Sequence, residues 1–406
     1  MSDRDRRRHE DRLRRQRRTR LERLGLGAIL VAVVAIGAFL LLRGGSGDEP
    51  EAAAPAAEAT SRGATTTETE RAAAPESRVE IAATGDIAVL GEPPGGGAAL
   101  VASVDGLLEG DVVVGNLEGT LATGGVSKCG EDEAAADEPQ TCFAFRAPPE
   151  LAGHLRTAGF TVMNLANNHS SDFGPGGLEE TLAALDAAGL LATGTPERIA
   201  TQTVAGGADG QPVKVAVLGF APYPETNSLL DIPGAQALVE RADAQADLVV
   251  VTFHGGAEGP DALHVQPGEE TYLGERRGDA VAFSHAVVDA GADLVLGHGP
   301  HVVRGMEFHQ GRLLAYSLGN FATYKGLNVD GVRGLSAVLQ VTLAGDGGFV
   351  AGRLRPVFIP ASGAPQPGGA AVEHVRVLSR QDFGDSAPRI DGAGRIRPPA
   401  APQDSG

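Results

Sequence analysis

The fold is indicated by Val249-Val-Val-Thr-Phe-His-Gly-Gly-Ala-Glu258, an apolar run followed at once by polar side chains. Two later stretches repeat this arrangement, Leu294-Val-Leu-Gly-His-Gly-Pro-His301 and Tyr316-Ser-Leu-Gly-Asn320. Short apolar runs are typical of buried strands in α/β proteins, and the residues just beyond their C-terminal ends line a common crevice. The three stretches therefore predict one site on which His, Glu and Asn side chains converge.

Three earlier stretches end in the same way. They are Ile81-Ala-Ala-Thr-Gly-Asp86, Val112-Val-Val-Gly-Asn-Leu-Glu118 and Val162-Met-Asn-Leu-Ala-Asn-Asn-His-Ser-Ser-Asp172. Imidazole, carboxylate and amide groups without a thiolate suit Mn, Zn or Fe better than copper or an iron–sulfur cluster. The whole set predicts a metal-assisted reaction centre.

The order of elements along the chain predicts an α/β fold, because apolar runs alternate with segments of helical spacing. The expected strands are 79–84, 111–115, 161–165, 213–219, 247–253, 293–297, 313–318 and 335–342. The expected helices are 98–108, 149–158, 176–188 and 276–290. A short apolar stretch from Val372 to Leu378 is expected to pack back as an edge strand.

These residues resemble a known family, the CapA or PgsA-like proteins of capsule and poly-γ-glutamate synthesis. The resemblance covers roughly residues 79–360, and its most specific parts are Asn164-Leu-Ala-Asn-Asn-His-Ser-Ser-Asp-Phe-Gly174, Gly291-Ala-Asp-Leu-Val-Leu-Gly-His-Gly-Pro-His301 and Tyr316-Ser-Leu-Gly-Asn-Phe321. The fold of that family belongs with the calcineurin-like metallophosphoesterases. The resemblance thus implies a four-layer α-β-β-α metallophosphoesterase-like sandwich, with two mixed sheets face to face between helices.

The resemblance also implies a metal-ligand set and one or two divalent ions. Asp86 is similar to the first metal aspartate of the superfamily, and Asn168 with His169 is similar to its Asn-His pair. Further histidines match the later ligand positions. The candidate metal ligands are Asp86, Asn116, Glu118, Asn168, His254, His298 and His301.

Two departures from the superfamily pattern put a full two-metal centre in doubt. Asp86 is followed by Ile87 and Ala88, so a usual histidine is missing, and Gly115-Asn-Leu-Glu118 stands where a bridging aspartate is usual. Two metals about 3.5–4 Å apart need a bridging anion to offset their repulsion. Glu118 or Glu258 could restore that charge, which leaves one well-held metal and a weaker second one.

A bound dication lowers the pKa of water from about 15.7 towards 7 and supplies hydroxide for attack on a phosphoryl or acyl centre. The candidate catalytic residues are His169, Asp172 and Glu258. Two of them have structural alternatives, since His169 could cap the next helix and Asp172 could start it. Ser317 and Asn320 are expected to border the site, or simply to end a strand.

The N-terminus predicts a membrane anchor. Residues 1–23 hold eleven arginines against five acidic side chains, and 24–42 is an unbroken run of nineteen apolar or glycine residues. Such a run spans roughly 28 Å as a helix, close to the bilayer core. We expect the arginine-rich tail in the cytoplasm and the main domain outside, with the N-terminal anchor in contact with membrane lipid. A cleavable signal peptide is the alternative.

Composition divides the rest of the chain. Residues 43–77 are rich in Ala, Pro, Thr and Glu and are expected to be a disordered linker. Residues 78–365 are expected to form one domain, and 366–406 a largely disordered tail. The two cysteines, Cys129 and Cys142, are expected to form a disulfide outside the membrane, with metal binding as the poorer alternative because no CxxC spacing is present.

The net charge of the chain limits the kinds of partner that it can bind. The chain carries a formal charge of −18, and the first 23 residues contribute about +6, so the remainder is near −24. Such a surface disfavours general binding of an anionic polymer, and the scarcity of aromatic residues disfavours nucleic acid. A groove for polyglutamate would need local cations, for which the candidates are Arg146, Arg276, Arg277, Arg304, Lys325 and Arg333.

Two classes of function remain open at this stage. The first is a component of capsule or poly-γ-glutamate biosynthesis or export in the cell envelope, partnered by a polymer synthase or export complex. The second is a metal-dependent hydrolase of envelope phosphoesters or polymer amide bonds. The surviving ligand residues favour metal chemistry in both, and enzymatic activity is left open.

Overall fold

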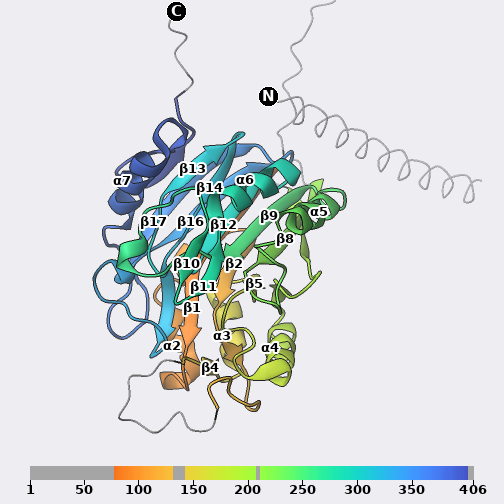
Figure 1. Cartoon of the computed structure of the whole chain (residues 1–406), viewed down its shortest axis with the longest axis vertical. Coiled ribbons are helices and arrows are strands. Elements are labelled where there is room, and N and C mark those ends of the chain that lie inside the picture. The colour runs from red at the N-terminus through yellow and green to blue at the C-terminus, as the bar shows by residue number, and fades with distance from the viewer. Residues whose placement is uncertain (1–76, 131–141, 207–210, 401–406) are drawn as a thin grey trace, which may run out of the picture. The chain divides into compact units, whose positions relative to one another are not determined.

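The computed structural model describes residues 77–130, 142–206 and 211–400 (Figure 1). Two mixed sheets dominate them. In spatial order the larger sheet consists of β19 (Arg389–Ile390), β20 (Arg395–Arg397), β17 (Phe349–Phe358), β16 (Leu335–Ala344), β1 (Arg78–Val89), β2 (Val112–Leu117), β5 (Val162–Asn164) and β6 (Leu191–Thr193), with β15 (Asn320–Tyr324) paired to β1 and β18 (Gln366–Pro367) paired to β17.

The second large sheet runs in the order β13 (Met306–His309), β14 (Arg312–Ala315), β12 (Leu294–His298), β9 (Leu248–His254), β8 (Gln211–Phe220) and β7 (Ala200–Gly206). Two small pairs complete the described strands. They are β3 (Thr120–Leu121) with β4 (Arg146–Ala147), and β10 (Glu270–Tyr272) with β11 (Glu275–Gly278).

The two large sheets pack face to face, with helices on their outer faces. In β9, Val250 faces the core between the sheets, whereas Val249 and Val251 face the helices. This alternation follows from the two-residue period of a strand, and burial on both faces explains the continuous apolar run. Helices α2 (Ala98–Val101), α3 (Leu151–Ala158) and α4 (Gly174–Ala187) cover the larger sheet, and α5 (Ile232–Asp243) and α6 (Ala280–Ala290) the smaller one.

The mixed α/β architecture expected from the sequence is confirmed, while some helix bounds differ. The helix expected over 98–108 is interrupted, because α2 ends at Val101 and a short 3-10 helix follows at Asp105–Leu107. The helix expected from residue 276 begins at Ala280 instead. Asp279 caps α6 by accepting a hydrogen bond from the Ala282 amide, and the preceding residues form β11.

The expectation for the C-terminal segment was wrong. Residues 366–397 contain β18, α7 (Ala371–Phe383), β19 and β20, so most of the supposed tail is ordered, and 401–406 lie outside the described residues. The stretch from Val372 to Leu378, expected as an edge strand, lies within α7. The buried positions 371, 375, 378 and 379 have helical spacing, which a short apolar run does not reveal.

Contacts with both sheets order this segment. The Ser379 hydroxyl accepts a hydrogen bond from the Met306 amide at 2.9 Å, and Phe383 stacks on Tyr316 with ring centroids 5.0 Å apart. Ile390 and Ile396 belong to the core between the sheets. The segment therefore closes one end of the sandwich core.

The expected membrane span, residues 24–42, lies outside the described residues, as do the arginine-rich tail and the linker up to residue 76. In the described part of the chain, no helix combines the length and the apolar character that crossing a bilayer requires.

Replacing Ile396 by alanine tests the correction to the C-terminal segment. Because Ile396 is 2 % exposed in the inter-sheet core, we expect Ile396→Ala to lower the free energy of unfolding by about 2–5 kcal/mol in urea denaturation. Leu273→Ala, at a side chain that is 82 % exposed, is the control and should change it little. Equal unfolding midpoints for both variants would show that the segment does not pack on the core.

Candidate metal centre

The C-terminal ends of the parallel strands meet at one edge of both sheets. In the larger sheet the register pairs Asp86 with Asn116 and Asn116 with Asn164. In the smaller sheet it pairs His298 with His254. Residues that are far apart in sequence are thus fixed at the same level by backbone pairing, as predicted for strand ends.

Asp86 is set by a close approach of two backbones. A Cβ atom on the preceding Gly85 would lie 1.9 Å from the Gly319 carbonyl oxygen, so only glycine fits there. The Asp86 amide donates a hydrogen bond to that same carbonyl at 2.9 Å. This contact joins β1 to the turn before β15 and places Asp86 beside Asn320.

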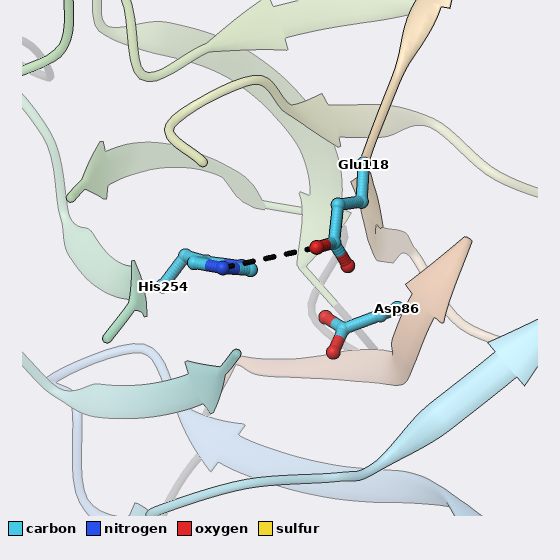
Figure 2. A group of neighbouring side chains, drawn as sticks. All are labelled: Asp86, Glu118 and His254. Atoms are coloured by element: carbon cyan, nitrogen blue, oxygen red, sulfur yellow. Dashed lines mark ion pairs between the residues drawn. The ribbon is translucent and has the colours of Figure 1, made fainter. Parts of the chain in front are cut away.

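Asp86, Glu118 and His254 form a compact group of possible metal ligands (Figure 2). One ligand atom from each lies within 4.8 Å of the other two, and all three residues are buried. In Figure 2 the two carboxylates and the imidazole point toward one another, with Glu118 Oε1 3.9 Å from His254 Nε2. Oxygen and imidazole donors of this kind suit a divalent cation.

Several polar atoms around this group are buried without a hydrogen-bond partner among the residues that the structure describes. They include both carboxylate oxygens of Glu118, Nε2 of His254 and Oδ1 of Asn168. Burial raises the pKa of Glu118 well above its usual range and lowers that of His254 well below it. A buried carboxylate with no donor is costly, and a bound cation would satisfy it. The residues present therefore fit a divalent metal ion.

His298 and His301 flank Asp86. His298 Nδ1 lies 3.3 Å from Asp86 Oδ1, and His301 Nδ1 lies 3.1 Å from Asp86 Oδ2. Burial opposes ionisation of Asp86, but contacts with the two imidazoles hold its pKa well below the usual range. His301 Nε2 also approaches Glu118 Oε1 at 3.5 Å. Burial alone would lower the pKa of His301. The negative charges of Glu118 and Asp86 outweigh this effect and raise the pKa to about 10.

Asn116, predicted as a ligand, is the centre of an amide network. Its Nδ2 donates to Asp86 Oδ1 at 2.8 Å and lies 3.2 Å from His254 Nδ1. Its Oδ1 accepts hydrogen bonds from Asn164 and Asn167, at 2.9 and 3.2 Å. Because both acceptor positions are occupied, Asn116 orients the Asp86 carboxylate and does not itself present an oxygen to the centre.

Asn164 and Asn167 were missed as functional residues by the sequence reasoning. Both lie in the stretch that ends in Asn168 and His169, and each anchors Asn116. Asn167 also accepts a hydrogen bond from the His169 amide at 3.0 Å. Asparagines in register at neighbouring strand ends were the available signal, since β5 pairs Asn164 with Asn116.

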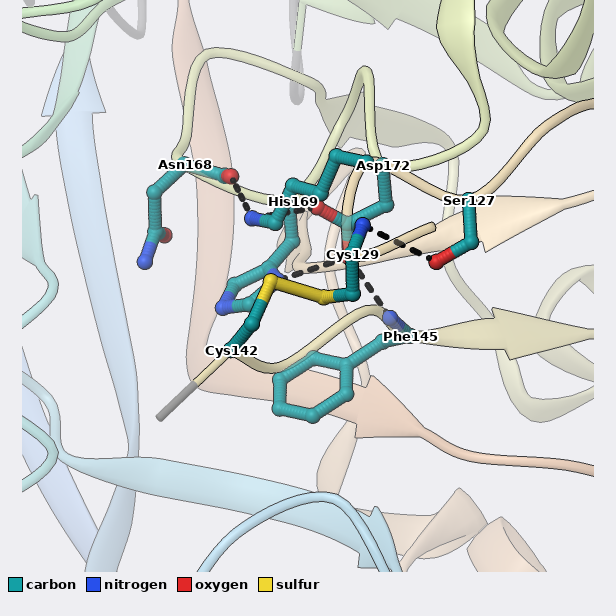
Figure 3. The surroundings of a disulfide bond; sticks show 8 residues. Ser127, Cys129, Cys142, Phe145, Asn168, His169 and Asp172 are labelled. Carbon is teal, nitrogen blue, oxygen red and sulfur yellow. Dashed lines mark hydrogen bonds and ion pairs between the residues drawn. A yellow bond between two sulfur atoms is a disulfide. The ribbon is translucent and has the colours of Figure 1, made fainter. Parts of the chain in front are cut away.

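His169 and Asp172 form a hydrogen-bonded pair at the rim of the centre (Figure 3). His169 Nδ1 lies 2.7 Å from Asp172 Oδ2, and its Nε2 lies 3.9 Å from Glu118 Oε1. Burial lowers the pKa of His169, although the hydrogen bond to Asp172 opposes this. Asp172 also accepts from the Phe145 amide at 2.6 Å, and the Phe145 ring stacks on His169 with centroids 4.1 Å apart.

A disulfide joins Cys129 to Cys142 beside this pair, with Cα atoms 5.7 Å apart (Figure 3). The neighbouring Lys128 forms an ion pair with Asp172 Oδ1 at 2.6 Å and donates to the Asn168 carbonyl at 3.1 Å. The loop closed by the disulfide therefore contacts both Asp172 of the His169–Asp172 pair and the adjacent residue Asn168. Residues 131–141 within the loop lie outside the described residues.

The remaining predicted residues lie further from the ligand group. Glu258 Oε1 accepts from Arg277 at 2.8 Å, and its Oε2 lies 3.7 Å from His301 Nε2. Asn320 Oδ1 contacts His301 Nδ1 at 3.1 Å and so orients it. The Ser317 hydroxyl accepts from the Gly319 amide at 3.2 Å and supports the turn before β15.

The family model of the bacterial capsule synthesis protein PGA_cap matches residues 80–325, which include all the candidate ligands. The chain belongs to this family.

Two relatives are similar to this PGA_cap family member over much of the domain. It is 30 % identical over 291 residues to the capsule biosynthesis protein CapA of Bacillus anthracis, covering 67 % of this chain and 63 % of that one. It is 31 % identical over 189 residues to the PGA biosynthesis protein CapA of Bacillus subtilis (strain 168), covering 42 % and 45 %. The chain spans less than two thirds of the length of each of these relatives.

Among solved structures, the chain is similar to the 5'-nucleotidase precursor from Thermus thermophilus. The TM-score is 0.38 and the sequence identity 14 %, with 75 % of this chain and 58 % of that one covered. The NAD nucleotidase of Haemophilus influenzae gives a TM-score of 0.34 at 12 % identity, covering 76 % and 57 %.

Asn116→Leu tests the amide network of this PGA_cap protein. The substitution keeps the volume but leaves buried polar groups of Asp86, Asn164 and Asn167 short of a partner, so we expect a loss of about 3 kcal/mol in the free energy of unfolding. Asn328→Leu, at an exposed loop position, should cost little. Urea denaturation followed by circular dichroism measures both, and unchanged stability of Asn116→Leu would contradict the role given to the network.

Proposed function

We propose that this protein acts in the synthesis or export of a bacterial capsule polymer such as poly-γ-glutamate, and that a divalent cation held by Asp86, Glu118 and His254 is required for that action. Family membership and the names of the two CapA relatives support the biological process. The observation that carries the metal proposal is Glu118, a buried carboxylate whose two oxygens have no hydrogen-bond donor in the described part of the chain.

The donor set supports one well-held ion. Besides the three central residues, Asn168 offers a buried unpartnered oxygen, and His298 and His301 lie against Asp86. Nitrogen and oxygen donors together favour Mn, Zn or Fe. A second, weaker ion on the side of His298 and His301 is part of the proposal. A centre with two ions would be consistent with the metallophosphoesterase-like four-layer sandwich that we infer from the family motifs together with the sheet packing.

A hydrolytic activity on phosphoesters or polymer amides is the second candidate, and the His169–Asp172 pair favours it. The metal, when bound, supplies a Lewis acid and an activated water. Asp172 holds the proton on Nδ1 of His169, so Nε2 faces Glu118 and the centre and can accept or deliver a proton. Lys128 and the Phe145 ring hold this pair in place.

The proposed place of action is the outer side of the cell membrane. The apolar run 24–42 would anchor the chain by a single helix in contact with lipid, with the arginine-rich tail in the cytoplasm. A polymer synthase or export complex would be the partner there. The cysteine pair is consistent with an oxidising compartment.

Metal content tests the first part of the proposal. We expect the full chain to retain about one Mn²⁺ or Zn²⁺ after gel filtration, measured by inductively coupled plasma mass spectrometry, because no described residue donates a hydrogen bond to the buried Glu118 carboxylate. Glu118→Gln should lower metal affinity by roughly tenfold or more. Glu225→Gln, at an exposed site, is the matched control. A wild-type chain that retains no metal would contradict the proposal.

The hydrolase candidate is tested at His169. We expect His169→Gln to reduce hydrolysis of an aryl phosphate or a γ-glutamyl peptide by about 100-fold, the usual scale for loss of a general acid or base, with metal content unchanged. His154→Gln, at a histidine on the outer helix α3, should have no effect. Full activity of His169→Gln, or no turnover by the wild type, would contradict the hydrolase function. Neither result would contradict the proposed metal site.

A further inference from the structure

Two separate segments hold the His169–Asp172 pair, and the first of them is centred on Lys128. Its ammonium forms an ion pair with Asp172 Oδ1 at 2.6 Å and donates to the Asn168 carbonyl at 3.1 Å. The Lys128 amide donates to the Asp172 carbonyl at 2.7 Å. One residue therefore contacts Asp172 through both its side chain and its backbone.

The second segment holds the pair from the side of Phe145. The Phe145 amide donates to Asp172 Oδ2 at 2.6 Å, and the Phe145 ring stacks on the His169 imidazole with centroids 4.1 Å apart. The Asp172 side chain is fully buried, and Phe145 is 3 % exposed. Asp172 Oδ1 thus faces Lys128, while Oδ2 faces Phe145 and His169. The position of this one carboxylate depends on both segments.

The Cys129–Cys142 disulfide joins these two segments to each other. Cys129 directly follows Lys128, and Cys142 lies three residues before Phe145. In Figure 3 the sulfur–sulfur bond lies beside the His169–Asp172 pair. Both cysteines are half-buried, so a small reagent in solution can reach them. The cross-link therefore combines proximity to the pair with access from solvent.

The segment of Lys128 needs the cross-link more than the segment of Phe145 does. Residues 122–130 form no helix or strand, and the Lys128 side chain is 38 % exposed. An ion pair of a partly exposed lysine contributes little by itself, because water competes for the ammonium. Phe145, by contrast, directly precedes β4, and its carbonyl accepts from the Thr120 amide at 2.9 Å. The disulfide thus ties a loosely held segment to a firmly held one.

We infer that the Cys129–Cys142 disulfide is a redox-sensitive clamp on the candidate catalytic pair. While the bond is intact, Lys128 and Phe145 act as positioning residues that fix the Asp172 carboxylate, and Asp172 orients the His169 imidazole toward the centre. Reduction separates the two segments and frees Lys128. The inference rests on the hydrolase candidate of the proposed function and adds a regulation to that site.

The redox step is thiol–disulfide exchange with a dithiol. One thiolate of the dithiol attacks a sulfur of the disulfide and forms a mixed disulfide, and the first cysteine leaves as a thiolate. The second thiolate of the reagent then displaces the other cysteine. The reagent loses two electrons and closes its own disulfide, while Cys129 and Cys142 gain two electrons and two protons and become thiols.

The first test follows the His169 imidazole and needs neither metal nor turnover. Diethyl pyrocarbonate modifies accessible imidazoles, and mass spectrometry locates the modified histidines. On the metal-free full chain we expect His169 to be modified roughly tenfold faster in the Cys129→Ser/Cys142→Ser double variant than in the wild type, because local opening uncovers the ring. His154, on the outer helix α3, is the internal control and should react at an unchanged rate.

The second test measures hydrolysis of an aryl phosphate by the Mn²⁺-treated full chain. We expect reduction by dithiothreitol, with the reagent then removed under nitrogen, to lower kcat by roughly tenfold or more with little change in KM, because a catalytic group is misplaced. Reoxidation should restore kcat. Lys128→Met should cause a similar loss, whereas Lys128→Arg should retain most of the activity, because arginine can also pair with Asp172. Lys214→Met, in β8, is the matched control and should behave as the wild type does.

The outcomes separate the clamp from the proposed function. A His169 modification rate that is the same in the double variant and the wild type overturns the clamp, and so does an equal acceleration at His154, which would mean general unfolding. An active wild type whose kcat does not respond to dithiothreitol, or a double variant that still responds to it, overturns the clamp as well. A wild type without turnover contradicts the hydrolase candidate alone, and the His169 measurement then still decides the clamp.

Discussion

Two carboxylates that water cannot reach, Asp86 and Glu118, constrain the rest of this structure. Their ligand oxygens lie within 4.8 Å of each other and of His254. Two like charges at about 4 Å repel by roughly 4 kcal/mol at the effective dielectric of a protein, before any cost of desolvation. Within residues 77–130, 142–206 and 211–400, Asp86 has donors in Asn116 and the neighbouring imidazoles, but Glu118 has none. A proton or a cation must therefore accompany Glu118, and the surrounding donors suit a cation.

The sandwich makes this arrangement possible by bringing two sheets together at one edge. Parallel pairing of β1, β2 and β5 puts Asp86, Asn116 and Asn164 in register, and β9 with β12 does the same for the two histidines. The apolar cores pack behind these side chains. His301 adopts a left-handed backbone conformation, with φ of 56°, and such strain is tolerated where surrounding contacts fix it. Asp86, Glu118 and Asn320 provide those contacts.

Much of the centre could be predicted because each polar residue directly follows an apolar strand, and strand ends of one parallel sheet must meet. That rule placed Asp86, Glu118, His254, His298 and His301 together. It could not decide whether Asn116 binds a metal or orients its neighbours, since this depends on which amides reach its oxygen. Arg277 was among the candidate cations, but its pairing with Glu258 could not be predicted, because the two residues lie on different segments of the chain. The helix α7 was misread because its apolar stretch is too short to distinguish a period of 3.6 from a period of two.

The most direct measurement is anomalous diffraction from crystals of the protein grown with Mn²⁺, collected at the manganese edge. The account predicts a peak between the carboxylates of Asp86 and Glu118 and Nε2 of His254, with the amide of Asn116 turned toward Asp86. The absence of a peak there, with Glu118 hydrogen-bonded instead to a neutral donor, would contradict the claim that this group of side chains is built around a divalent cation.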